Sequence, residues 1–159
     1  MSTPETYHRV LVPLDGSPLA EVVLPFVSRL ARPLGLEIAL LRVIPVVTPT
    51  VVEGGTRRII LDQGERLREE AEVYLRGVAG SLLADGFRVT TTVRTGEAAP
   101  EIVAGARECQ ADLIGMMTHG RTGLGRLFFG SVAEAVLRHA AVPVFVVRAT
   151  EAQLARSAA

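Results

Sequence analysis

A glycine- and arginine-rich stretch in the last third of the chain has the residue types best suited to hold a ligand. The segment 116–131 reads MMTHGRTGLGRLFFGS and precedes the amphipathic run VAEAVL. Glycines let backbone N–H groups approach a ligand closely, and a helix beginning near Ser131 would add free N–H groups and the positive end of its dipole. Arg121 and Arg126 would contribute charge. This combination suits a phosphate group, so the stretch indicates a phosphate or nucleotide site.

The same stretch also has a purely structural interpretation. It is longer than the two to six residues that usually join a strand to a helix, but it could be a glycine-rich connector with an ordinary helix cap. Ser131 and Glu134 fit the S-x-x-E pattern of a capping box, which alone would explain Ser131. A Ser131–His119–Asp15 catalytic triad is disfavoured, because no nucleophile elbow is present and a triad is recognised by geometry.

The composition limits the other classes of function. The chain has 159 residues, which predicts one domain over 1–150 followed by a tail over 151–159. A formal net charge of zero argues against nucleic-acid binding, and all 17 basic residues are Arg, which excludes a P-loop lysine or a Schiff base. No apolar run is long enough for a membrane span, no signal peptide is recognisable, and the single Cys109 cannot form an internal disulfide. We therefore expect a cytoplasmic protein.

Short apolar runs alternate with longer amphipathic ones along the chain, which is typical of an α/β fold with a parallel sheet. Helices are predicted from Ser17 (the N-cap) to the region of Leu30, and over Ile59–Ala84, Glu97–Cys109 and Ser131–His139. The predicted strands are Val10–Leu14, Glu37–Ile44, Phe87–Arg94, Leu113–Met117 and Val142–Val147. Ligands bind beyond the carboxyl ends of such strands, where strand order reverses. If the first and fourth strands are neighbours, Asp15 and the glycine-rich stretch lie together.

Several local features refine these boundaries. Pro25 lies inside the first predicted helix and should kink it. The apolar face of that helix is predicted to consist of Leu19, Val22, Val23, Phe26, Val27 and Leu30. The segment 45–58 is rich in Pro, Thr and Gly and is predicted to be a mobile loop, and Gly86 is predicted to end the helix that follows this loop.

Three segments resemble the universal stress protein family: VLVPLDGS near the amino terminus, LLRVI after the first helix, and THGRTGLGRLFFGSVAEAVLRHAAVPVFVVR near the end. The resemblance covers nearly the whole chain. It implies a Rossmann-like, five-stranded parallel open sheet of order 3-2-1-4-5 with helices on both faces. It also implies a dimer, joined through the last strand, Val142–Val147, whose apolar edge would favour pairing.

ATP-binding members of that family carry G-x-x-G, nine residues, and then G-S or G-T. Gly120, Gly130 and Ser131 match this motif, but Met117 stands where its first glycine is expected. Two consequences stay open. The Met117 side chain could fill the space of the ribose or the phosphates, or it could swing aside, because methionine is flexible.

The resemblance also implies roles for individual residues. Asp15 would bind the ribose, Pro13 would lie near the base, the Val43 backbone would meet the adenine edge, and the Val132 amide would bind phosphate. On the structural alternative, Asp15 is only a turn residue and Val43 a core residue.

The function implied is a dimeric stress-response module that binds an adenine nucleotide, with ATP and its accompanying Mg²⁺ the expected ligand, and in which the loop 117–130 orders over the phosphates. Slow hydrolysis is the most catalysis expected. The alternatives are a nucleotide-free, dimeric protein-interaction module with its pocket closed by Met117, and a nucleotide hydrolase using Asp15.

Overall fold

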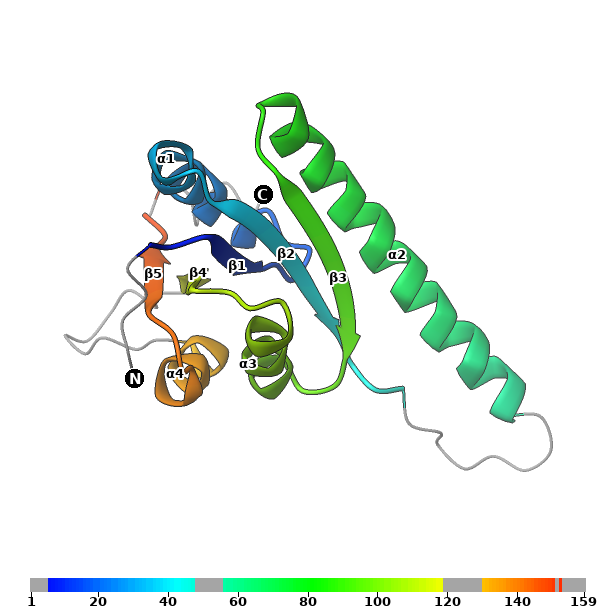
Figure 1. The fold of residues 1–159 in the computed structure, drawn as a ribbon. Helices are drawn as coiled ribbons and strands as arrows, with labels where there is room; N and C mark the ends of the chain where they lie inside the picture. Colours follow the sequence, from blue (N-terminus) through cyan, green and yellow to red (C-terminus); the bar gives the residue numbers. More distant parts are fainter. Residues whose placement is uncertain (1–5, 48–55, 119–129, 151, 153–159) are drawn as a thin grey trace.

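The fold is an α/β arrangement of helices around one sheet (Figure 1). The computed structural model describes residues 6–47, 56–118, 130–150 and 152, with α2 side chains described from Gln63 onward. The elements are β1 (Arg9–Pro13), the 3₁₀ helix η1 (Ala20–Val23), α1 (Leu24–Leu34), β2 (Glu37–Ile44), α2 (Thr56–Ala84), β3 (Val89–Thr95), α3 (Ala98–Glu108), β4 (Leu113–Thr118), α4 (Ser131–His139) and β5 (Val144–Arg148).

The five strands are all parallel and lie in the order β3-β2-β1-β4-β5, which confirms the predicted topology. β1 is central: Val10 lies opposite Ile38 of β2 and Leu113 of β4. Strand order therefore reverses between β1 and β4. The carboxyl ends of these two neighbours meet at one edge of the sheet, where a ligand site is expected.

Helices cover both faces of the sheet and bury a separate core on each (Figure 1). Alternate strand residues such as Val10 and Val12 pack with α1 and α2, whereas Leu11 packs with α3 and α4. The inner strands β1, β2 and β4 are thus apolar on both sides, which is why their sequences lack a polar–apolar alternation, whereas the edge strand β3 carries exposed threonines. Among the described residues no helix is long and apolar enough to cross a membrane.

The first helical segment differs from its prediction. The predicted N-cap at Ser17 is wrong, because Leu19 precedes the 3₁₀ helix η1 without a side-chain cap and α1 begins only after η1. The Ser17 Oγ instead accepts a hydrogen bond from the Ala20 N–H at 3.1 Å. Pro25 therefore lies in the first turn of α1, where no helical N–H is lost, and does not kink a continuous helix. The buried face includes Val23 and Val27, whereas the predicted core residue Phe26 is 45% exposed.

The end of α2 explains why β3 begins later than predicted. Gly86 ends the helix as expected, with a φ of 87°, and its N–H bonds to the Leu83 carbonyl. The Phe87 N–H donates to the Leu82 carbonyl at 3.1 Å, which completes a Schellman motif and keeps Phe87 out of β3.

Among the other segments, β1, β4 and α3 differ from their predicted bounds by one residue at one or both ends, and two differ by more. The last strand begins after Pro143, which has no N–H to donate, and runs as Val144–Arg148 rather than Val142–Val147. Helix α2 begins at Thr56, three residues before the predicted Ile59. Most of the predicted mobile loop 45–58 lies outside the described residues.

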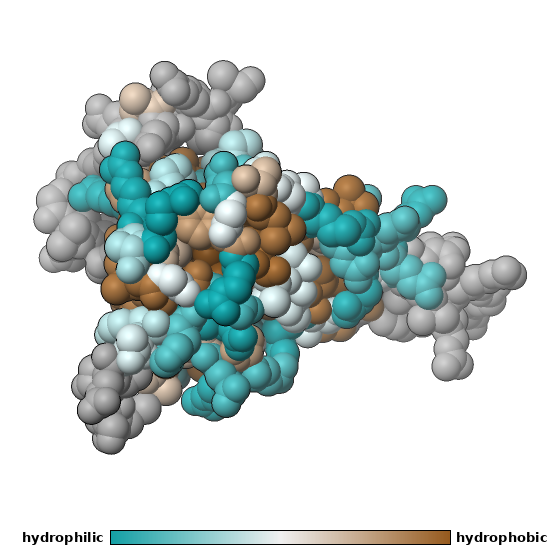
Figure 2. Space-filling view, turned by 45° about the horizontal axis from the view of Figure 1, so that its top comes forward, coloured by the Kyte–Doolittle hydropathy of each residue, from teal (hydrophilic) through white to brown (hydrophobic). Residues whose placement is uncertain are grey.

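The amino-terminal part of α2 extends well past the sheet (Figure 1). Its side chains between Gln63 and Glu70 are mostly exposed and polar, and this projecting end is largely hydrophilic in Figure 2. Among the α2 side chains that the structure describes, from Gln63 onward, the first in the core is Ala71. The sheet therefore anchors α2 from Ala71 onward, whereas the segment 63–70 is mostly exposed, as its arginine- and glutamate-rich sequence indicates.

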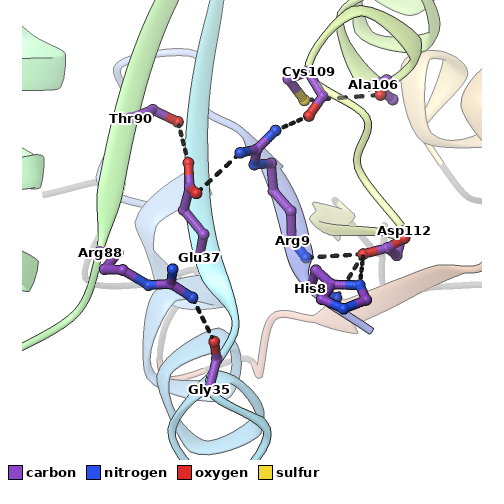
Figure 3. Close-up of polar contacts among 9 residues, drawn as sticks. All are labelled: His8, Arg9, Gly35, Glu37, Arg88, Thr90, Ala106, Cys109 and Asp112. Atoms are coloured by element: carbon purple, nitrogen blue, oxygen red, sulfur yellow. Dashed lines mark hydrogen bonds and ion pairs between the residues drawn. The ribbon is translucent and has the colours of Figure 1, made fainter. Parts of the chain in front are cut away.

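A polar cluster at the amino ends of β1 and β2 fixes the opposite edge of the sheet (Figure 3). The Arg9 guanidinium pairs with Glu37 at 3.0 Å and also donates to the Cys109 carbonyl. Asp112 accepts backbone N–H groups of His8 (2.6 Å) and Arg9 (2.9 Å). These bonds tie β1 to β2 and to the turn before β4, far from the carboxyl ends.

Replacement of Glu37 by glutamine is expected to lower the free energy of unfolding by about 2 kcal/mol at neutral pH. The hydrogen bond from Arg9 lowers the pKa of Glu37 below its ordinary value, despite partial burial, so ionised Glu37 stabilises the folded state above its unfolded pKa. This contribution falls as the pH drops through the folded pKa. Chemical denaturation of the wild-type and Glu37→Gln proteins should therefore show a difference in the free energy of unfolding that becomes smaller below about pH 4. Glu72→Gln, at a more exposed pair, should cost under about 0.5 kcal/mol, and an equal loss there would contradict the argument.

Candidate functional site

A cavity of about 230 Å³ opens at the carboxyl ends of β1 and β4, between the sheet and the amino ends of α3 and α4. Seven of the eight residues predicted for the site line it: Pro13, Asp15, Val43, Met117, Gly130, Ser131 and Val132. The eighth, Gly120, lies outside the described residues, as do His119, Arg121 and Arg126. Residues from separate parts of the chain thus converge on the place that the topology indicates.

Asp15 lies in a tight turn directly after β1. Its Oδ1 accepts a hydrogen bond from the Ser17 N–H at 2.8 Å, and Gly16 between them has a φ of 87°. Within the described part of the chain, Oδ2 accepts no hydrogen bond. The carboxylate is exposed and borders the cavity, so it both shapes the turn and offers its second oxygen to a ligand.

The amino end of α4 has no side-chain cap. Gly130 is the N-cap, and Ser131 is already the first helical residue, so the predicted capping box is wrong. Glu134 instead pairs with Arg138 at 2.7 Å. Among the described residues, the N–H groups of Ser131, Val132 and Ala133 have no acceptor. The start of α4 therefore keeps its donors and its positive dipole end available.

The backbone conformation of Gly130 does not require a glycine. Its φ of −57° and ψ of 152° suit any residue, and a Cβ built there would meet no atom of the described residues within 4 Å. A side chain at this N-cap position would thus meet none of the described residues. This is the arrangement expected where a ligand must approach the backbone closely.

Thr118 is a site residue that the sequence interpretation missed. It ends β4, it is buried, and its Oγ1 accepts a hydrogen bond from the Gly130 N–H at 3.1 Å. This bond joins the two ends of the glycine-rich stretch. The available sequence indication was a hydroxyl residue immediately after the last apolar position of the strand.

The Met117 side chain packs on the α1 side of β4. It forms a small cluster with Leu19 and Ala149, against which Val22 and Val147 also pack. The neighbouring Met116 packs on the other face, with α3 and α4. Met117 therefore borders the cavity where β4 ends, while its buried side chain fills core space beside η1.

Comparison with known proteins assigns the chain to a family. The family model for the universal stress protein family matches residues 6–148. The chain belongs to the universal stress protein family. Universal stress protein MJ0531 of Methanocaldococcus jannaschii is 34% identical over 145 residues, which cover 89% of this chain and 82% of that protein.

Solved structures of this family share the fold. The structure of MJ0577, a universal stress protein of the same organism, superposes with a TM-score of 0.76 at 30% identity and covers 92% of this chain and 99% of that one. A universal stress protein solved in complex with cAMP is 20% identical, with a TM-score of 0.67, and covers 92% of this chain and 100% of its own. A family protein from Arabidopsis thaliana solved with AMP bound is 14% identical, with a TM-score of 0.66, and covers 92% and 94%. At these last two identities the likeness concerns the fold.

The remaining wall of the cavity in this universal stress protein is apolar. Ala98 and Ile102 of α3 and Met116 of β4 line it together with Val43. No motif marks these positions, but the turn from β3 to α3 reaches the same edge of the sheet. No group of three or more His, Cys, Asp or Glu residues that could hold a metal lies within the described ranges. The cavity thus combines an apolar wall, a carboxylate and a helix amino end.

Proposed function

We propose that this universal stress protein binds an adenine nucleotide, with ATP the expected ligand, in the cavity between β1, β4 and α4. The observation that carries the proposal is the convergence of Asp15, the apolar wall and the uncapped start of α4 on one cavity. These are the three kinds of surface that a ribose, a base and a phosphate chain require.

Each part of the nucleotide has a matching group. The Asp15 carboxylate would accept hydrogen bonds from the ribose hydroxyls, and the Ser131 and Val132 N–H groups would donate to phosphate oxygens. Pro13 and Val43 would flank the base, with Ala98 and Ile102 across from them. Gly120 is included in the proposed site because it matches the second glycine of the family motif. Mg²⁺ would arrive with the nucleotide, held mainly by its phosphates.

The family supports an adenine nucleotide as the ligand class. One structural relative was solved with cAMP and another with AMP. Because both are distant in sequence, the weight of the proposal rests on the groups in this cavity.

The protein would act as a binding and regulatory module in a cytoplasmic stress response rather than as an efficient enzyme. The described cavity residues include no histidine or lysine to serve as a base, and Asp15 is already engaged with the Ser17 N–H. Nucleotide binding, coupled to closure of the segment 117–130, would be the regulatory event.

Calorimetric titration of nucleotide-free protein with ATP and Mg²⁺ tests the proposal. We expect micromolar binding, weakened about 10- to 100-fold in Asp15→Ala, since hydrogen bonds to a charged group contribute about 1.5–3 kcal/mol. Absence of binding, confirmed by a second method, would contradict the proposal and favour the nucleotide-free interaction module. Unchanged binding with lost turnover in Asp15→Ala would favour the hydrolase.

We also propose a homodimer formed through the final strand region, Val142–Val147. Among the described residues β5 pairs only with β4 and forms an edge of the sheet, and its Val and Phe side chains are half-buried. An apolar edge strand of this kind presents unpaired backbone groups to a second copy.

Val146→Pro is expected to convert the dimer to a monomer. The Ile114 N–H donates to the Pro143 carbonyl, so in a parallel ladder the N–H groups of Val144 and Val146 point away from β4. Proline at 146 would remove an outward donor and spare the β4–β5 ladder. Sedimentation equilibrium measures the outcome, with circular dichroism as the check on folding. A folded variant that remains dimeric would exclude this edge as the interface.

A further inference from the structure

We propose that Arg42 is a positioning residue that holds the Asp15 turn in its ligand-binding geometry. The inference rests on the proposed function and goes beyond it, because Arg42 does not line the cavity. It lies near the end of β2 on the face covered by α2, whereas the cavity residue Val43 lies on the other face.

The guanidinium of Arg42 packs directly against Gly16. A Cβ built on Gly16 would lie 2.9 Å from each of the Cζ, Nη1 and Nη2 atoms of Arg42. Equal distances to three atoms mean that the flat face of the guanidinium meets the backbone. The φ of 87° is what requires glycine at 16, and a side chain there would also push the Arg42 guanidinium away from the turn.

Tyr74 of α2 holds the arginine in place. The Arg42 Cζ lies 5.1 Å from the centroid of the Tyr74 ring, which is a cation–π contact. The Tyr74 hydroxyl donates to Glu21 Oε1 at 2.9 Å, which links α2 to η1. Burial, and then this bond to Glu21, raise the pKa of Tyr74 well above its ordinary value, so the hydroxyl remains a donor at physiological pH.

These contacts form a closed path around the Asp15 turn. Arg42 supports Gly16, Tyr74 supports Arg42, and Glu21 leads back through η1 to the residues that follow Ser17. Beyond burial and Glu21, the negative charge of Asp15 raises the pKa of the Tyr74 hydroxyl and the positive charge of Arg42 lowers it. Within the described residues Arg42 makes no ion pair, so its guanidinium is held by Gly16 and Tyr74 rather than by a carboxylate.

The consequence is specific to the ribose. If Arg42 sets the position of Asp15, its loss should weaken contacts to the ribose hydroxyls and leave contacts to the base and phosphates intact. A residue that only stabilises the fold would weaken all of these contacts together or none of them.

The experiment compares the affinities for ATP and 2′,3′-dideoxy-ATP, which differ only in the ribose hydroxyls. In the wild-type protein we expect about 30-fold weaker binding of the dideoxy nucleotide, since hydrogen bonds to a charged acceptor are lost. In Arg42→Met we expect this ratio to fall to about 3-fold, with dideoxy-ATP affinity unchanged. Arg32→Met is the matched control, because Arg32 also stacks on a ring, that of Phe87 at 4.7 Å, but away from the cavity. It should keep the wild-type ratio.

A second variant covers the case in which Arg42→Met does not fold. Tyr74→Phe keeps the ring and removes only the hydrogen bond to Glu21, so the ratio should fall to an intermediate value. An unchanged ratio in either folded variant, or an equal loss for both nucleotides, would overturn the positioning role. A wild-type protein that binds ATP without discriminating would also overturn it, while leaving nucleotide binding intact. A wild-type protein that binds neither nucleotide would instead overturn the proposed function and this inference together.

Discussion

Met117→Gly is expected to lower the free energy of unfolding by about 3–5 kcal/mol and to leave the ATP affinity within about 3-fold of wild type. The reason is the direction of the Met117 side chain, which is buried against Leu19 and Ala149. Its removal would leave a cavity beside η1 and a flexible glycine within β4, opposite Val147. Restoring the glycine of the family motif at position 117 would therefore remove core packing.

Thermal and urea unfolding measure the stability change, and calorimetry measures the affinity. A protein of this size should lose about 10 °C in melting temperature. Met117→Leu is the control, because it preserves volume and should cost less than about 1.5 kcal/mol. An ATP affinity that rises tenfold in Met117→Gly with unchanged stability would mean that the side chain blocks the nucleotide, and that the pocket of the native protein is closed.

The sequence predicts the sheet well because its apolar runs are continuous and widely spaced. Runs such as Glu37–Ile44 are flanked by clear helix starts and stops, and the bounds of β2 agree with the prediction. Strands buried on both faces admit few other interpretations. The strand order 3-2-1-4-5 rested on the family resemblance, and the observed pairing confirms it.

The positions of individual side chains at the site could not be predicted in the same way. The direction of Met117 depends on which face of β4 each residue takes, and this is fixed by packing against η1, an element whose 3₁₀ start the sequence does not reveal. Helix α4 has its predicted bounds, Ser131–His139, but its N-cap is Gly130, so the Ser131 hydroxyl does not cap the helix as the capping-box alternative requires. Thr118 and Arg42 carry no motif, because their roles come from contacts with residues distant in the chain.

Gly130→Val is expected to weaken ATP binding by about 100-fold or more while costing at most about 1 kcal/mol of stability. The small cost follows from the backbone, since φ and ψ at 130 suit any residue and no described atom opposes a Cβ. Valine is a poorer N-cap than glycine, which accounts for the remaining loss. The large effect on binding follows from the place of the side chain, in front of the Ser131 and Val132 N–H groups. Two charge-assisted hydrogen bonds to phosphate, each worth about 1.5–3 kcal/mol, would be prevented.

A graded series separates steric exclusion at the phosphates from a general disturbance of the protein. Gly130→Ala should give a smaller loss of ATP affinity than Gly130→Val, and adenosine, which has no phosphate, should bind all three proteins alike. Gly80→Ala is the matched control, because Gly80 lies exposed in α2 and a Cβ built on it would meet no atom within 4 Å, so ATP binding should be unchanged. If Gly130→Val binds ATP as tightly as the wild type, the phosphates do not lie at the start of α4. The nucleotide would then have to bind elsewhere, and the convergence of residues on this cavity would have a structural origin alone.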